Sequence, residues 1–136
     1  MSCSFCQERD EKLQPLKDET HLLQEIKNTL IRDELIEMTP YFESSMFVPS
    51  ERWLQALIEA KELHGIKFGW RTESRVDSIP LKLVPLMAKA GLKVLDLGLE
   101  SASHVQLRNM GKTRYPEKYL EKASKLINTA YEFRAC

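Results

Sequence analysis

The sequence of 136 residues has no long apolar run and only three cysteines. No stretch approaches the roughly 18 apolar residues that a membrane-spanning helix needs, and the first residues lack the basic-then-apolar order of a signal peptide. We therefore expect a cytoplasmic protein without a membrane span. Three cysteines also argue against the disulfide framework of a small secreted domain and favour a metal-binding or redox role for Cys3 and Cys6.

The sequence also lacks an excess of either charge. Twenty basic residues balance twenty acidic ones, so no overall field attracts the chain to nucleic acid or to an anionic membrane. Internal repeats, low-complexity tracts and Ser/Gly-rich linkers are missing as well. With 43% hydrophobic residues, the length favours one domain over residues 1–136 that buries its own core. Composition and charge do not identify a ligand, so it must be inferred from candidate site residues.

Turn signals and apolar spacing predict a regular alternation of helices and strands. The first expected helix begins after Asp18 or Thr20 and has the apolar stripe Leu22, Leu23, Ile26 and Leu30. Three further helices are expected from the cap Ser50 to about Gly65, from Asp77 or Ser78 to Gly91, and around 119–130. The expected strands cover 35–42, 66–71 and 94–97, with a possible fourth from Glu132. Pro85 falls inside one predicted helix, where proline costs about 3 kcal/mol, so this helix either kinks there or starts later; we expect a kink.

This alternation predicts an α/β fold with a mainly parallel sheet and right-handed crossovers. Ligands in such folds bind at the carboxyl ends of the strands. Polar residues follow each predicted strand: Glu43 the first, Glu73 and Arg75 the second, and Glu100 and Ser101 the third. We therefore expect them at one edge of the sheet.

Several motifs resemble those of one enzyme family. Cys3, Phe5 and Cys6 match the last three defined positions of the signature Cys-x-x-x-Cys-x-aromatic-Cys, whose first cysteine would lie before Met1. Further matches are the segments 42–47, 70–77 and 90–91, and Gly98-Leu99-Glu100-Ser101 with Leu107, Met110 and Lys112 behind it. The chain thus resembles the central stretch of a radical S-adenosylmethionine (radical SAM) enzyme, closest to the branch that often carries a cobalamin-binding domain.

The resemblance implies a partial (β/α) radical SAM TIM-like barrel, running from the cluster loop to the start of the fifth barrel strand. It implies a 4Fe-4S cluster with an incomplete ligand set, S-adenosylmethionine and an unidentified substrate as ligands, and cobalamin as an option in a full-length parent. Such enzymes reductively cleave S-adenosylmethionine to a 5′-deoxyadenosyl radical, or support radical methyl transfer. With one cluster cysteine missing, we expect the chain alone to be inactive.

The resemblance also implies a role for each matching residue. Cys3 and Cys6 would be metal ligands, Phe5 would lie beside adenine, Glu43 would accept from the methionine ammonium, Arg75 would meet the carboxylate, and Glu100 and Ser101 would hydrogen-bond the ribose hydroxyls. No residue is given a direct catalytic role.

Other interpretations of the same residues stay open. Glu100 could cap the helix that follows it, and Arg75 could form a salt bridge with Asp77. The chain could be a non-catalytic β/α nucleoside-binding or interaction module without a cluster, or Cys3 and Cys6 could bind zinc with ligands from another chain. An open half-barrel would expose strand edges and an apolar sheet face, so we also expect self-association.

Overall fold

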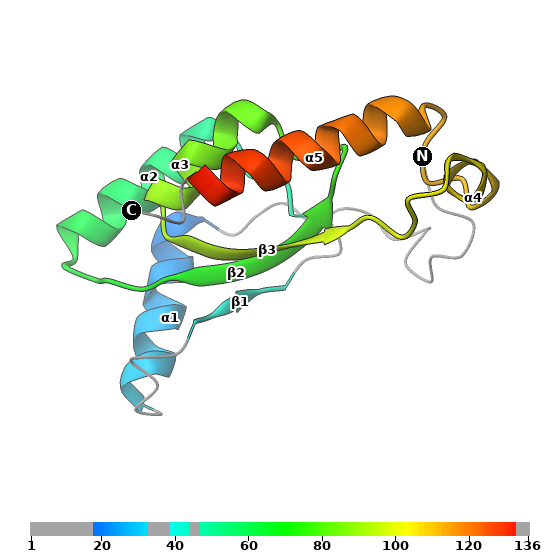
Figure 1. The fold of residues 1–136 in the computed structure, drawn as a ribbon. Helices are drawn as coiled ribbons and strands as arrows, with labels where there is room; N and C mark the ends of the chain where they lie inside the picture. Colours follow the sequence, from blue (N-terminus) through cyan, green and yellow to red (C-terminus); the bar gives the residue numbers. More distant parts are fainter. Residues whose placement is uncertain (1–17, 33–38, 44–46, 133–136) are drawn as a thin grey trace.

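The computed structural model of the protein describes residues 18–32, 39–43 and 47–132, which form an α/β fold (Figure 1). Three parallel strands, β1 (Tyr41–Phe42), β2 (Trp70–Arg75) and β3 (Leu92–Gly98), lie in the order β1-β2-β3. The α/β class and the parallel sheet predicted from the sequence are confirmed.

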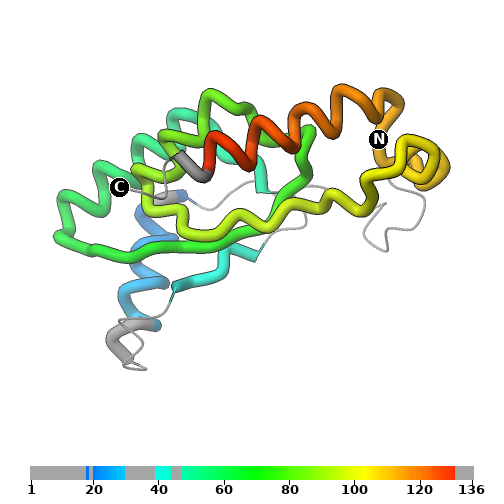
Figure 2. The backbone as a smooth tube through the Cα atoms, in the orientation of Figure 1, coloured from blue at the N-terminus to red at the C-terminus, as the bar shows by residue number. Residues whose placement is uncertain are grey.

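Helices alternate with these strands along the chain. They are α1 (Glu19–Arg32), α2 (Glu51–Leu63), the 3₁₀ turn η1 (Leu81–Leu83), α3 (Val84–Lys89), α4 (His104–Asn109) and α5 (Pro116–Glu132). The tube in Figure 2 shows α2, α3 and α5 together over one face of the sheet, while α4 lies beyond the carboxyl end of β3. Within the described ranges, no helix combines the length and the apolar composition needed to cross a bilayer.

Local signals place α1 and α2 where the sequence predicts them. The Asp18 side chain accepts a hydrogen bond from the backbone N–H of Thr20 at 3.0 Å, which makes Asp18 the cap of α1. Ser50 caps α2 by accepting from the N–H of Trp53 at 3.1 Å. The buried face of α2 consists of the predicted residues Leu54, Leu57 and Ile58.

Trp70 lies at the centre of the core. Its side chain is fully buried, and its ring stacks on Phe42 of the neighbouring strand with centroids 4.9 Å apart. Phe47 packs against it at 5.4 Å, and the indole N–H donates to the backbone oxygen of Ala90 at 3.0 Å. One side chain therefore joins β1, β2 and the turn that precedes β3.

The second strand begins and ends later than the sequence predicts. The prediction placed it at 66–71, whereas β2 runs from Trp70 to Arg75 and buries Trp70, Thr72 and Ser74 on its helix-facing side. The hydroxyls of Thr72 and Ser74 donate to the backbone oxygens of Phe42 and Phe47, both at 2.8 Å, so these polar residues are satisfied in the interior. Glu73 and Arg75 accordingly lie within the strand, not past it.

The predicted kink at Pro85 is wrong. Residues 81–83 form a 3₁₀ turn, and α3 begins at Val84 with Pro85 in its first turn. The first turn of a helix needs no intrahelical partner for the backbone N–H, so proline fits there without bending the helix.

Other predicted boundaries change at the ends of the described segments. In the predicted strand 35–42 only Tyr41 and Phe42 are strand, and 35–38 lie outside the described residues. Glu132 belongs to α5, so the possible strand does not begin there. The short helix α4 has no counterpart among the predicted elements; its cap is Ser103, whose side chain accepts from the N–H of Gln106 at 3.4 Å.

The sheet face away from α2, α3 and α5 carries exposed charged side chains. Arg71 pairs with Asp96 across β2 and β3 at 2.9 Å, and the guanidinium lies 5.3 Å from the ring centre of Tyr41. Glu73 is exposed on the same face, opposite Asp96 in the register. Exposed Tyr41 and Val94 lie on this face as well, so it mixes charged and apolar side chains, and the expected self-association stays a prediction.

Candidate functional site

The carboxyl ends of β2 and β3 bring three of the predicted site residues to one edge of the sheet. Arg75, the last residue of β2, is in register with Gly98, the last residue of β3, and Glu100 and Ser101 follow directly. Glu43 follows β1 and is exposed, but the register places it closer to the middle of β2. Among the described residues, no hydrogen bond or ion pair joins Glu43 to the other three.

Glu100 has an unusual backbone and a buried partner. Its φ of 66° lies in the left-handed region, which costs energy for a residue with a side chain, and every other positive-φ residue in the described ranges is a glycine. Its Oε1 accepts from the Nζ of Lys112 at 2.9 Å, and the Lys112 side chain is only 5% exposed. Since a buried ammonium needs a partner, Lys112 fixes the carboxylate of Glu100 at the edge.

Gly98 provides the space that this ion pair occupies. A Cβ atom at this position would lie 3.0 Å from Oε1 of Glu100 and 3.2 Å from Nζ of Lys112. The carbonyl of Gly98 also accepts from the Tyr119 hydroxyl at 2.7 Å, which ties α5 to the end of β3. The glycine that leads the acidic turn is thus needed for close approach of the charged pair.

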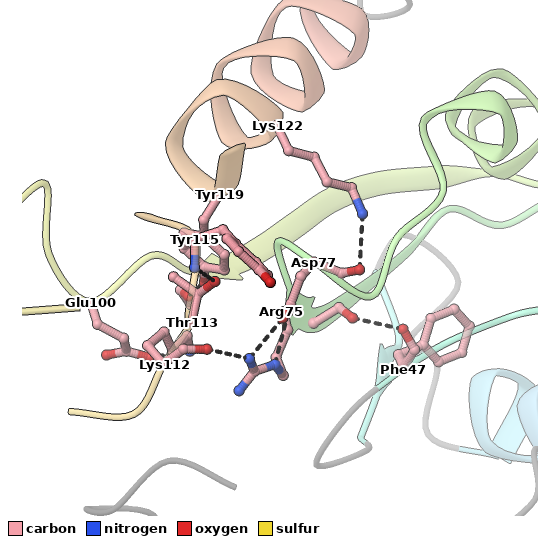
Figure 3. A network of polar contacts seen from close by, with 11 residues as sticks. Phe47, Arg75, Asp77, Glu100, Lys112, Thr113, Tyr115, Tyr119 and Lys122 are labelled. Carbon is pink, nitrogen blue, oxygen red and sulfur yellow. Dashed lines mark hydrogen bonds and ion pairs between the residues drawn. The ribbon is translucent and has the colours of Figure 1, made fainter. Parts of the chain in front are cut away.

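Arg75 is partly buried, and Figure 3 shows its contacts with Asp77 and Lys112. Its Nε and one terminal nitrogen donate to the two carboxylate oxygens of Asp77, each at 2.9 Å, and a terminal nitrogen also donates to the backbone oxygen of Lys112 at 2.8 Å. Of the two interpretations of Arg75, the structure shows the salt bridge to Asp77. The guanidinium connects the end of β2 to the loop that carries Lys112.

Asp77 gives this network a pH dependence. Burial alone would raise the pKa of Asp77, but the hydrogen bonds and the charge of Arg75 outweigh burial and hold that pKa below its usual value. A lowered carboxylate pKa stabilises the fold at pH values above the pKa of the unfolded chain, and this stabilisation is lost as the pH falls through the folded pKa.

We therefore expect the difference in unfolding free energy between the wild type and Asp77→Asn to be largest above about pH 4 and to shrink on further acidification. Urea titrations at a series of pH values measure it. A difference that stays constant from neutral to strongly acidic pH would show that the Arg75–Asp77 pair adds no stability.

Ser101 lies next to Glu100 and is bonded within its own loop. Its hydroxyl donates to Oε1 of Gln106 at 2.5 Å and accepts from the N–H of Ser103 at 2.9 Å. To donate to a ligand, Ser101 would have to release Gln106, which is exposed and at the start of α4. Glu100 requires no such change, because its Oε2 accepts no hydrogen bond from the described residues.

Three residues of this edge were missed as site residues by sequence reasoning. Lys112 was noted only as part of the motif, Tyr119 only as part of an apolar helix face, and Lys122 not at all. Lys122 donates from Nζ to the backbone oxygen of Asp77 at 2.9 Å, so α5 contacts the ends of both β2 and β3 (Figure 3). The burial of Lys112 is the signal that marks it, and burial is visible only in the fold.

The predicted metal ligands Cys3 and Cys6, together with Phe5, lie outside the described residues. In the ranges 18–32, 39–43 and 47–132, no group of three or more His, Cys, Asp or Glu side chains is arranged to hold a metal ion. The carboxylate of Glu100 at the described edge is an acceptor suited to hydroxyl and ammonium donors. Comparison of the chain with protein-family models, curated proteins and solved structures finds no match.

Proposed function

We propose that this chain is part of a radical SAM enzyme and that the carboxyl edge of its sheet binds the nucleoside of S-adenosylmethionine. The observation that carries the proposal is Glu100: a strained, left-handed residue whose carboxylate is fixed by buried Lys112 while Oε2 remains available. Strain of this kind persists where the surrounding structure enforces it, and it clusters at ligand sites.

A carboxylate at this position suits the vicinal hydroxyls of ribose. Each hydroxyl can donate to a carboxylate oxygen, and a charged acceptor makes these hydrogen bonds stronger than neutral ones. Lys112 orients the carboxylate without occupying both of its oxygens. Arg75 acts in this proposal as a positioning residue, because its pairing with Asp77 and its bond to the Lys112 carbonyl fix the loop that carries Lys112.

The remaining assignments follow from the resemblance. Cys3 and Cys6 would supply two thiolates to a 4Fe-4S cluster, with Phe5 beside adenine and Glu43 near the methionine ammonium. Held by these thiolates, a cluster would supply the electron for cleavage of the sulfonium carbon–sulfur bond of S-adenosylmethionine. Two thiolates fall short of the three that the family uses, so we propose that the 136-residue chain binds the nucleoside but does not cleave it.

Anaerobic reconstitution with iron and sulfide tests the cluster assignment. We expect substoichiometric iron and no electron paramagnetic resonance signal that changes on adding S-adenosylmethionine, since one thiolate ligand is lacking. A stoichiometric cluster whose signal responds to S-adenosylmethionine would contradict the proposed inactivity. Bound zinc in place of iron would contradict the cluster assignment itself.

A second candidate function is a nucleoside-binding module that works without any cluster. It is favoured by the Glu100–Lys112 pair, which is complete within the described residues and needs no thiolate. The two candidates differ in one measurable way. If the module is non-catalytic, the affinity for S-adenosylhomocysteine is the same before and after iron reconstitution and in a Cys3→Ser/Cys6→Ser variant.

A further inference from the structure

A hollow lies at the opposite end of the sheet from Glu100. It has a volume of about 800 Å³ and is lined by the last turns of α2, the connection from α2 to β2, and the residues that lead from α3 into β3. In Figure 1 this is the end of β2 and β3 away from the arrowheads. Nothing in the proposed nucleoside site uses these residues.

The lining of this hollow is strongly basic. It contains Lys61, Lys67, Lys89 and Lys93, with Glu62 as its one acidic residue. None of the four lysines forms an ion pair with a described carboxylate, in contrast to Lys112 and Lys125. Although the whole chain has no net charge, this hollow therefore carries an excess of positive charge.

Lys61 is the most restrained of the four. Its Nζ donates to the backbone oxygens of Phe68 at 2.8 Å and Ala90 at 2.9 Å, and lies 4.4 Å from the ring centre of Phe68. Burial, followed by the charge of Lys93, lowers the pKa of Lys61. An ammonium has three N–H donors, and these two backbone oxygens accept from two of those of Lys61.

Two glycines make room for these lysine side chains. A Cβ at Gly91, whose φ is +104°, would lie 2.7 Å from Nζ of Lys61 and 2.8 Å from the oxygen of Phe68. A Cβ at Gly69 would lie 2.5 Å from Cγ of Lys93. Contacts of Lys61 with the backbone could be explained as a link between α2 and the strands, but such a link does not explain Lys67, Lys89 and Lys93 in the same hollow.

We propose that this basic pocket binds a small phosphate-bearing ligand. A phosphate group carries more than one negative charge and several acceptor oxygens, so it can bond several ammonium groups at once, whereas a carboxylate neutralises only one. Bringing an anion between Lys61 and Lys93 also removes the repulsion between these two cations. The volume lies within the range of pockets that enclose small molecules.

Pyrophosphate is the probe that tests the pocket. Isothermal titration calorimetry of the whole 136-residue chain near physiological ionic strength should show saturable binding at one site. The backbone amides of Gly65, Gly69 and Gly91 should shift in a parallel ¹H–¹⁵N NMR titration. We expect Lys93→Gln and Lys67→Gln each to weaken binding about tenfold, the effect of losing one hydrogen bond to a charged group.

Lys82→Gln is the matched control, because it removes the same charge from an exposed position in η1 outside the pocket, and it should leave the affinity unchanged. The proposal would be overturned if the titration showed no saturable heat. It would also be overturned if Lys93→Gln and Lys82→Gln lowered the affinity equally. Tighter binding of a single-stranded RNA oligonucleotide than of pyrophosphate would also overturn it, because the pocket would then be part of a nucleic-acid surface.

Discussion

Replacing Trp70 with alanine destabilises the fold by about 3–5 kcal/mol, the usual cost of truncating a fully buried tryptophan. The loss combines the stacking on Phe42, the packing against Phe47 and the hydrogen bond to Ala90. Since domains of this kind are stable by only about 5–15 kcal/mol, the variant loses a large part of its stability. Urea unfolding followed by circular dichroism measures the change.

Leu63→Ala is the control for this prediction, because Leu63 is 81% exposed and its truncation should change the unfolding free energy by less than about 0.5 kcal/mol. Trp70→Phe provides a milder test if the alanine variant does not fold. An equal effect of Trp70→Ala and Leu63→Ala would show that β1, β2 and the turn before β3 do not share one core.

The proposed nucleoside site predicts that replacing Glu100 with glutamine weakens the binding of S-adenosylhomocysteine by about tenfold to a hundredfold. Glutamine keeps the size of the side chain but removes the charge that strengthens hydrogen bonds from the ribose hydroxyls, a contribution of about 1.5–3 kcal/mol. It also leaves the buried ammonium of Lys112 without its carboxylate partner. Calorimetric titration measures the affinity, and urea unfolding of the same variant separates lost binding from lost folding.

Glu121→Gln is the matched control for Glu100→Gln. Glu121 also pairs with a lysine, Lys125, at 2.6 Å, but both side chains are exposed, and such pairs contribute little. We expect Glu121→Gln to leave both affinity and stability unchanged. Equal affinities of the wild type and a folded Glu100→Gln variant would remove the ribose role from Glu100.

The parts of the fold that depend on neighbouring residues were predictable from the sequence. Ser50 caps α2, and the apolar residues that follow at helical spacing form its buried face, because both signals act within a few residues. The bounds of β2 were not predictable in this way. Thr72 and Ser74 are polar, and they are buried because carbonyls about 30 residues earlier in the chain accept their hydrogen bonds.

The candidate site likewise has one part that the sequence predicts and another part that it does not. The location of Glu100 and Ser101 at the carboxyl edge follows from a parallel sheet, so the alternating pattern was enough to predict it. The contacts of Lys112 and Tyr119 depend on how the segment after β3 and α5 pack back on Gly98, and no local pattern encodes that packing. For Arg75, the sequence left a ligand carboxylate and Asp77 open as partners, and the fold shows the contact with Asp77.

A ¹H–¹⁵N NMR titration with S-adenosylhomocysteine tests most directly whether the carboxyl edge is a nucleoside site. The proposal predicts saturable shifts of the backbone amides of Gly98, Ser101 and Gly111, close to the Glu100–Lys112 pair, with the amides of Gly65 and Gly69 unchanged. Shifts confined to Gly65 and Gly69, or no saturable shift at all, would contradict the assignment of this edge to a nucleoside and the family role drawn from it.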